Sequence, residues 1–235
     1  MYIHGLQKMT LLDYPGKVAC TVFLAGCNYA CPYCHNSQLQ THDAEPLMHS
    51  DALLSFLQKR QGILDGVCIT GGEPTLNPEL PQLLARINAL GYAVKLDTNG
   101  SRPHVLRQLV EAGFVDYVAM DVKNGPAQYA QTVGVAGLQL KDVEESLRFL
   151  IGGHIPYELR TTLVQQLHDE ESIAAMGRWL AGLCPGKRPD VLYLQSFVDR
   201  DTVVFTGLSA PEKAQKERFA QLLGEFVQKV YLRGE

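Results

Sequence analysis

The chain has 235 residues, of which 46% are hydrophobic and 20% charged, and its formal net charge at pH 7 is −4. These values are typical of a soluble globular protein, and we expect a single domain over residues 1–235. The sequence has neither a basic block nor an apolar run of about 18 residues, so we expect no nucleic-acid partner and no membrane association. The crowded cysteines and the absence of a signal-peptide pattern favour the cytoplasm.

Six apolar, β-branched segments are typical of buried strands, and each is followed by a segment with a helical pattern. Strands are expected over 17–24, 66–70, 92–97, 115–122, 157–164 and 191–197. Helices are expected over 50–61, 78–90, 102–112, 142–150, 170–183 and 209 to about 232, with Ser50 and Ser209 as N-caps. We expect mostly loop over 124–138, and residues 1–16 end in a turn signal, L-D-Y-P-G. The alternation predicts a parallel α/β fold, either a barrel or an open sheet.

Three cysteines follow the first strand as Cys27, Cys31 and Cys34, with the spacing C-x3-C-x2-C. Thiolates this close can converge on one soft metal centre. A 4Fe–4S cluster usually takes four thiolates, so three would leave one iron open, but a catalytic zinc site has the same vacancy. A structural zinc would need a fourth ligand, and His42 suits that role better than His35, which is adjacent to a cysteine. Three ordinary thiols are the remaining interpretation.

Polar residues and glycines gather where the later strands end, which is the edge that carries function in parallel α/β folds. Simple turns at G-G-E-P and D-T-N-G, a helix cap at Asp121, an ion pair between Glu158 and Arg160, and a solvated loop charge at Lys123 are the alternatives. The strand-end candidates are Gly71, Gly72, Glu73, Pro74, Asp97, Thr98, Asn99, Asp121, Glu158, Arg160 and Gln195.

The joint pattern resembles the radical S-adenosylmethionine superfamily: C-x3-C-x2-C, G-G-E-P and D-T-N-G follow the first, second and third strands. More narrowly, L-D-Y-P-G-K-V-A-C-T-V-F-L-A-G-C-N-Y-A-C-P-Y-C-H-N is most similar to the activating proteins of anaerobic ribonucleoside-triphosphate reductase, within the glycyl-radical enzyme activases. The resemblance covers nearly the whole chain. It implies a partial parallel (β/α)6 barrel of the radical S-adenosylmethionine type.

The resemblance also implies the chemistry. Cys27, Cys31 and Cys34 would hold one 4Fe–4S cluster, whose open iron would bind the methionyl group of S-adenosylmethionine. One electron from a donor such as flavodoxin or ferredoxin would release a 5′-deoxyadenosyl radical. That radical would take hydrogen from a glycine of the partner, anaerobic ribonucleotide reductase. No catalytic residue is expected beyond the cluster.

Residues of the second and fifth strand ends would position the methionyl group in this resemblance. Gly71 and Gly72 would let the backbone approach the cofactor, because they have no Cβ. Glu73 would accept from the methionyl ammonium, and Pro74 would stiffen the turn. Arg160 would pair with the methionyl carboxylate.

The third and fourth strand ends would complete the site. Thr98 and Asn99 would hydrogen-bond the carboxylate or the ribose. Similar activases hold a monovalent cation near the methionyl carboxylate, and Asp97 and Asp121, with Thr98 beside them, match the positions of its acidic ligands. Contacts with adenine are expected from Tyr33 and Gln195.

Other functions remain open from the sequence. The chain could activate another glycyl-radical enzyme, such as pyruvate formate-lyase, or act on a small molecule by radical chemistry. A metal-binding regulator is the non-enzymatic alternative. Cys20, Cys68 and Cys184 are expected to be small core residues, so one cluster is expected.

Overall fold

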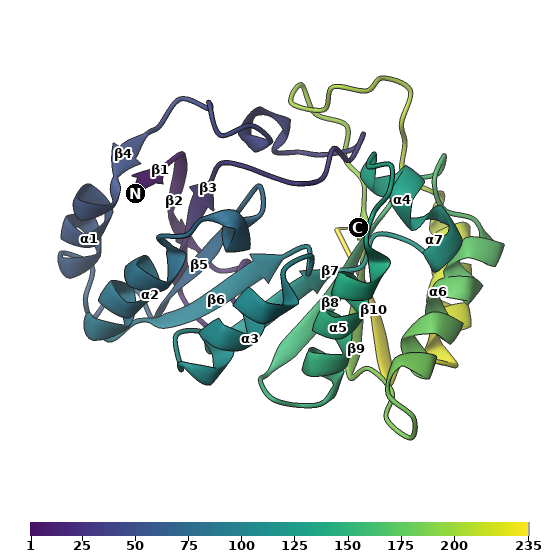
Figure 1. Cartoon of the computed structure of the whole chain (residues 1–235). Helices are drawn as coiled ribbons and strands as arrows, with labels where there is room; N and C mark the ends of the chain where they lie inside the picture. Colours follow the sequence, from purple (N-terminus) through teal and green to yellow (C-terminus); the bar gives the residue numbers. More distant parts are fainter. Residues whose placement is uncertain (235) are drawn as a thin grey trace. The chain divides into compact units, whose positions relative to one another are not determined.

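The computed structural model describes residues 1–234 and divides the chain into two compact units, each assembled from several segments (Figure 1). The first unit contains Met1–Asn28, Gln38–Thr98 and His104–Ala119. The second contains Tyr29–Ser37, Asn99–Pro103 and the chain from Met120 onward. A single domain over 1–235 stays a prediction, and its last residue, Glu235, lies outside the described residues.

The first unit has a mostly parallel sheet in the order β6-β5-β3-β2. Strands β3 (Ala19–Leu24), β5 (Gly66–Gly71) and β6 (Ala93–Thr98) are parallel, and β2 (Gly5–Thr10) is antiparallel to β3. A short antiparallel pair joins β1 (Tyr2–Ile3) to β4 (Met48–His49). The helical elements are α1 (Ser50–Gln58), the 3-10 turn η2 (Pro74–Leu76), α2 (Leu80–Ala89) and, from His104 onward, α3 (Pro103–Glu111).

The helices of the first unit form because apolar residues recur at helical spacing. In α1, Leu53, Leu54 and Leu57 are buried, and in α2 the buried residues include Leu84 and Ile87. This spacing gives each helix one apolar face. Helix α1 contacts α2, and α2 contacts β6, so α2 packs on the sheet and α1 packs on α2.

The second unit has parallel strands β8 (Tyr157–Leu163), β9 (Val191–Ser196) and β10 (Lys229–Arg233) in that order. Its helices are α4 (Pro126–Val133), α5 (Leu140–Ile151), α6 (Glu170–Leu183) and α7 (Lys213–Gly224). Helices α6 and α7 pack side by side in Figure 1. The chain enters this unit within β7 (Tyr117–Asp121), and the 3-10 turn η1 (Ser37–Leu39) lies where it leaves the cysteine loop.

The six predicted strand–helix units are confirmed. Each of β3, β5, β6, β7, β8 and β9 is followed by at least one α-helix before the next of these strands or the chain end. Parallel pairing is observed between β3 and β5, β5 and β6, and β8 and β9. Helix α6 has the predicted bounds, because Asp169 and Ser172 form a reciprocal capping box at its start.

The expected loop over 124–138 is wrong, because α4 occupies its centre. Pro126 begins the helix, and Gly134 ends it in the left-handed conformation with φ 68°. Tyr129 and Val133 are buried, so packing offsets the weak helical composition.

Both ends of the chain contain strands that were not predicted. Residues 1–16 contain β1 and β2 ahead of the turn signal, and the final helix stops at Gly224, before β10, and not near residue 232 as expected. The N-caps are His49 for α1 and Glu212 for α7, rather than Ser50 and Ser209. None of the helices within residues 1–234 has the length and apolarity needed to cross a bilayer.

Candidate cofactor-binding site

The G-G-E-P turn lies at the end of β5 and is packed against the residues that lead into the cysteine loop. Gly71 has φ +121°, and a Cβ there would lie 2.2 Å from the Leu24 carbonyl oxygen. A Cβ on Gly72 would lie 2.2 Å from the Gly26 carbonyl oxygen. The Gly72 and Glu73 amides donate to those two carbonyls at 2.9 and 2.7 Å. Both glycines are therefore required for close backbone contact within the chain itself; their contact with a cofactor stays a prediction.

Glu73 is buried and acts as an acceptor for several donors in the first unit. Its Oε1 accepts from the Thr75 amide at 3.1 Å and from the Thr98 hydroxyl at 2.8 Å, as well as from the Thr75 hydroxyl. These bonds connect the end of β5 to the end of β6. Pro74 begins η2, directly after the carboxylate. The arrangement fixes Glu73 in place, and its predicted role toward the methionyl ammonium stays a prediction.

Asp97 is paired with a buried lysine that sequence reasoning did not select. Lys95 lies two residues earlier on β6 with 1% side-chain exposure, and its ammonium donates to Asp97 Oδ1. The Cys68 thiol on β5 lies 3.7 Å from the same oxygen. The only signal in the sequence was a lysine inside an otherwise apolar strand, V-K-L.

Cys27, the first cysteine of the motif, belongs to the first unit. Its amide donates to the Gln40 carbonyl at 2.9 Å, and the Gly26 amide donates to the Leu39 carbonyl at 2.8 Å. The His42 imidazole, considered above as a zinc ligand, lies against Gly26. Backbone pairing with residues 39–40 therefore fixes the start of the cysteine loop.

Cys31 and Cys34 lie together in the second unit, where α4 supports them. The Cys34 amide donates to the Cys31 carbonyl at 3.2 Å, so the two cysteines share one turn. The Ala30 amide donates at 2.9 Å to the Val133 carbonyl in the last turn of α4. The helix that was expected to be a loop thus anchors the middle of the motif.

An apolar group surrounds this part of the loop. Tyr33, Val164 and Phe197 form a buried cluster, and Cys31 packs against it. Burial raises the pKa of the Cys31 thiol, and the nearby Lys123 ammonium opposes that rise. Tyr33 is buried in this cluster, and contact of its ring with adenine stays a prediction.

His35, directly after Cys34, is held by the segment that follows β9. The His35 ring stacks on Phe197 with centroids 5.6 Å apart, and its Nε2 lies 2.7 Å from the Val198 carbonyl oxygen. The Ser37 hydroxyl donates to the Thr202 carbonyl. Both sides of the Cys31–Cys34 turn are therefore anchored within one unit.

Asp121, at the end of β7, is paired with two cations. Lys123 Nζ lies 2.8 Å from Oδ2, and Arg160 Nε lies 3.1 Å from Oδ1. Burial disfavours the ionised carboxyl, but attraction and hydrogen bonding from Lys123 and Arg160 outweigh it and lower the pKa of Asp121 to about 2. The Lys123 ammonium also lies 6.0 Å from the centroid of the Tyr33 ring. Lys123 is thus part of this site and not a solvated loop charge.

Two further candidates, Asn99 and Gln195, lie in the second unit, at positions distant in the sequence from Asp121, Lys123 and Arg160. Asn99 is buried, and its Oδ1 accepts from the Ser101 amide at 2.9 Å. Gln195 is on β9, in register with Thr162 on β8 and with Arg233 on β10. Contact of either residue with S-adenosylmethionine stays a prediction.

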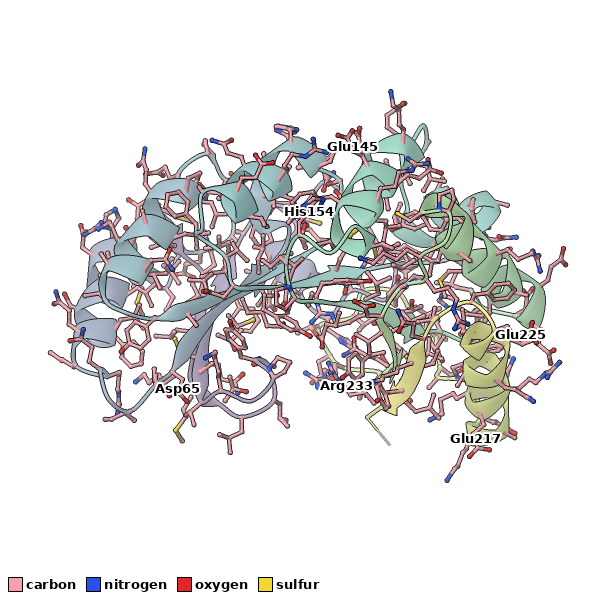
Figure 2. The ribbon with its side chains drawn as sticks, turned by 90° about the horizontal axis from the view of Figure 1, so that it is seen from below. Asp65, Glu145, His154, Glu217, Glu225 and Arg233 are labelled. Atoms are coloured by element: carbon pink, nitrogen blue, oxygen red, sulfur yellow. The ribbon has the colours of Figure 1, made fainter. Side chains whose placement is uncertain are left out.

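The Glu158 carboxylate is paired with Arg233, at 3.3 Å, and the Arg233 guanidinium lies 3.8 Å from the centroid of the Tyr193 ring. An ion pair between Glu158 and Arg160, one alternative from the sequence, stays a prediction. Figure 2 labels Arg233 at the end of β10. Arg160 pairs with Asp121 at the strand-end position.

His168 and Asn124 position the backbone around Lys123, and sequence reasoning missed both. His168 Nδ1 accepts from the Val164 amide at 3.1 Å, so its Nε2 carries the proton donated to the Lys123 carbonyl at 2.9 Å. The Asn124 amide group donates to the Thr132 hydroxyl at 2.9 Å. A histidine directly before the D-E-E-S helix start was the available signal.

Two of the three cysteines outside the motif are core residues, as expected, and the third is not. Cys20 and Cys68 are fully buried in β3 and β5, as expected. Cys184 is only partly buried, at the C-cap of α6, so it is not a core residue. No disulfide joins cysteines anywhere in residues 1–234.

The donor set fits an iron–sulfur cluster chemically. Cys31 and Cys34 are soft ligands, beside a lysine ammonium and an apolar cluster that limits water. Because burial raises the pKa of the Cys31 thiol, its thiolate would form together with metal binding and not in the cofactor-free protein. The described residues contain no group of three or more His, Cys, Asp or Glu side chains arranged around one ion, so ligation by all three cysteines stays a prediction.

Comparison with known proteins agrees with this chemistry. A protein of Methanocaldococcus jannaschii assigned as a glycyl-radical enzyme activating enzyme is 28% identical over 98% of this chain and 95% of its own length. The pyruvate formate-lyase-activating enzyme of Clostridium pasteurianum is 30% identical over 52% of each chain. The crystal structure of Streptococcus suis SuiB bound to S-adenosylmethionine matches with a TM-score of 0.64 and 12% identity, over 92% of this chain and 51% of that one.

The structural match confirms the predicted fold class, and the family profile covers most of the chain. The profile of the radical SAM superfamily matches residues 21–177, which include the three cysteines, G-G-E-P and D-T-N-G. The cofactors of this superfamily are a 4Fe–4S cluster and S-adenosylmethionine. The chain therefore belongs to the radical S-adenosylmethionine superfamily of enzymes, and it resembles the members that activate glycyl-radical enzymes.

Proposed function

We propose that this protein is the activase of a glycyl-radical enzyme and that its target is anaerobic ribonucleoside-triphosphate reductase. The observation that carries the proposal is the cysteine motif together with its flanks, from L-D-Y-P-G to C-H-N. The near full-length similarity to an assigned activase of Methanocaldococcus jannaschii supports the reaction class. The choice of the reductase, rather than pyruvate formate-lyase, depends on the motif flanks.

Cys27, Cys31 and Cys34 would hold the cluster through their thiolates. When bound, the reduced cluster would supply the one electron that cleaves S-adenosylmethionine to methionine and a 5′-deoxyadenosyl radical, and that radical would take hydrogen from a glycine of the partner. The protein has to hold the thiolates in place and keep water away. The anchoring of the Cys31–Cys34 turn by α4 and by residues 197–202 serves the first purpose. The Tyr33–Val164–Phe197 cluster serves the second.

The chain's charged groups would orient the methionyl end of the cofactor. Lys123 and Arg160 both face Asp121, and their positive charges would also attract the carboxylate of the methionyl group. Glu73, fixed by Thr75 and Thr98, would face the ammonium. No side chain is required as a general acid or base, since hydrogen-atom transfer moves the proton and electron together.

The partner would be the glycine-bearing protein, and a one-electron donor such as flavodoxin or ferredoxin would reduce the cluster. The absence of disulfides within residues 1–234 is consistent with a reducing cytoplasm. Clustered thiolates and a reduced cluster both require such a compartment.

The test is electron paramagnetic resonance on the reconstituted, anaerobic protein. Mixed with dithionite, S-adenosylmethionine and anaerobic ribonucleotide reductase, it should produce a glycyl doublet together with 5′-deoxyadenosine. A reductase labelled with deuterium at glycine α-carbons should collapse the doublet to a singlet and transfer deuterium into 5′-deoxyadenosine.

The control exchanges the target under the same conditions. Pyruvate formate-lyase should give no doublet. A doublet on pyruvate formate-lyase and none on the reductase would keep the activase reaction and reject the proposed target. Cleavage of S-adenosylmethionine without a radical on either protein would reject glycyl-radical activation of both.

A further inference from the structure

We propose that this chain binds S-adenosylmethionine without a monovalent cation, because its own basic side chains already neutralise the two carboxylates that would hold one. The resemblance leads to the opposite expectation, namely a cation held by Asp97 and Asp121. The inference rests on the proposed place of the methionyl group beside these residues. It does not depend on which protein, if any, receives the radical.

The first observation concerns Asp97 in the first unit. A cation ligand needs carboxylate oxygens that are not already neutralised. Asp97 Oδ1 accepts from the Lys95 ammonium, and Lys95 has only 1% of its side chain exposed. A buried ammonium loses much of its hydration and needs a nearby anion, so Lys95 and Asp97 stabilise each other. Removing the lysine's partner to bind a metal ion would leave that ammonium buried and unpaired.

The second observation concerns Asp121 in the second unit. Each of its oxygens is occupied by a different cation, Oδ2 by Lys123 at 2.8 Å and Oδ1 by Arg160 at 3.1 Å. Lys123 and Arg160 therefore already neutralise this carboxylate. A sodium or potassium ion would have to displace one of these contacts, whereas the carboxylate of a methionyl group could pair with the same two cations. Asp97 in the first unit and Asp121 in the second are thus each neutralised by basic side chains of the chain itself.

The positions of Lys95 and Lys123 in the sequence explain how the chain neutralises the two carboxylates. Lys95 and Asp97 are two residues apart on β6, so their side chains leave the same face of the strand. Lys123 lies two residues beyond Asp121, the last residue of β7. In both cases the cation is covalently attached at contact distance, which gives it an effective concentration far above that of a dissolved ion.

The test compares binding and cleavage of S-adenosylmethionine in buffers with sodium, potassium or choline as the sole monovalent cation, at equal ionic strength. We expect the dissociation constant and the rate of dithionite-driven 5′-deoxyadenosine formation to differ by less than threefold. A loss of threefold or more in choline, restored by sodium or potassium, would overturn the proposal. On the protein without cofactors, ²³Na relaxation should show no saturable broadening, and saturable broadening would also overturn it.

A variant tests the role of the lysine directly. Lys95→Met keeps an unbranched side chain of similar length but leaves Asp97 without its ammonium. In choline its affinity for S-adenosylmethionine should fall tenfold or more, and potassium or sodium should restore most of the loss. The matched control is the exposed lysine in Lys59→Met, which should show no response to the cation. An equal response of Lys95→Met and Lys59→Met to cations would contradict the role of Lys95.

The double variant Lys95→Met/Asp97→Asn separates charge from folding. It removes both charges, so the cation response of the single variant should disappear, and circular dichroism checks its fold. If Lys95→Met does not fold, the wild-type comparison of cations still decides the proposal. Because no partner protein is present in these assays, failure of the glycyl-radical proposal would leave their outcome unchanged.

Discussion

Substitution of Gly134, the residue that ends α4, tests directly whether that helix supports the cysteine loop. Its φ is +68°, and a Cβ added there would lie 2.4 Å from the Ala30 carbonyl oxygen. Ordinary contacts of this kind lie at 3.4 Å or more, so Gly134→Ala must open the gap by about 1 Å. Ala30 immediately precedes Cys31, and its amide donates to the Val133 carbonyl. The substitution therefore pushes directly on the cysteine turn.

The chain contains a matched control in Gly137→Ala. Gly137 has φ +73° and no neighbouring atom within 4 Å of an added Cβ. Both substitutions place a side chain in the left-handed region, which costs about 1–2 kcal/mol. Only Gly134→Ala also strains the hydrogen bond between Ala30 and Val133, worth about 1 kcal/mol. We expect the free energy of unfolding to fall by about 2–3 kcal/mol for Gly134→Ala and about 1–2 kcal/mol for Gly137→Ala.

Urea unfolding of the cofactor-free proteins measures these differences. Iron content and cluster absorbance after anaerobic reconstitution then show whether the cysteine turn has moved. We expect Gly134→Ala to hold several-fold less iron than Gly137→Ala under identical conditions. Equal stability and equal iron content in the two variants would refute the claim that α4 supports the cysteine loop.

Three further outcomes are expected. Cys31→Ala should lose both cluster absorbance and 5′-deoxyadenosine formation, whereas Cys184→Ala should keep them; retention in Cys31→Ala would remove Cys31 from the ligand set. His168→Phe removes a donor to the Lys123 carbonyl and should lower the free energy of unfolding by about 2–4 kcal/mol, with partial recovery in His168→Gln; equal loss in both would show that packing alone matters. Because the pKa of Asp121 is lowered to about 2, its ionisation stabilises the fold fully above the unfolded pKa near 4 and less as the pH falls toward 2. The stability difference between wild type and Asp121→Asn, measured by urea unfolding, should therefore shrink from pH 5 to pH 2, and a constant difference would contradict the ion pairs.

The sequence was sufficient for the strand–helix alternation and for the strand-end residues. Buried parallel strands are continuous apolar runs, and their ends are fixed by where those runs stop. The prediction failed at α4 because composition was weighed above the helix signals of Pro126 and Gly134, which were present. It failed at β10 because a strand of five residues that begins soon after a helix has too little pattern to be separated from it.

Partners of the site residues were harder to predict than the residues themselves. Arg160 was selected correctly as a strand-end residue, but its partner Asp121 lies 39 positions earlier in the chain. Such pairings depend on the register between strands that are far apart in the sequence, which the residue pattern of each strand does not specify. His168 was missed because its role is set by contacts with the Lys123 carbonyl and the Val164 amide, which only the folded chain brings together.

Because Lys95 lies two residues from Asp97 on the same strand, the counter-ion of Asp97 is part of the protein itself. A counter-ion encoded in the polypeptide cannot be diluted, exchanged or pumped out of the cell. The charge balance at this carboxylate is therefore inherited with the gene, and osmotic swings that alter sodium and potassium levels leave it untouched.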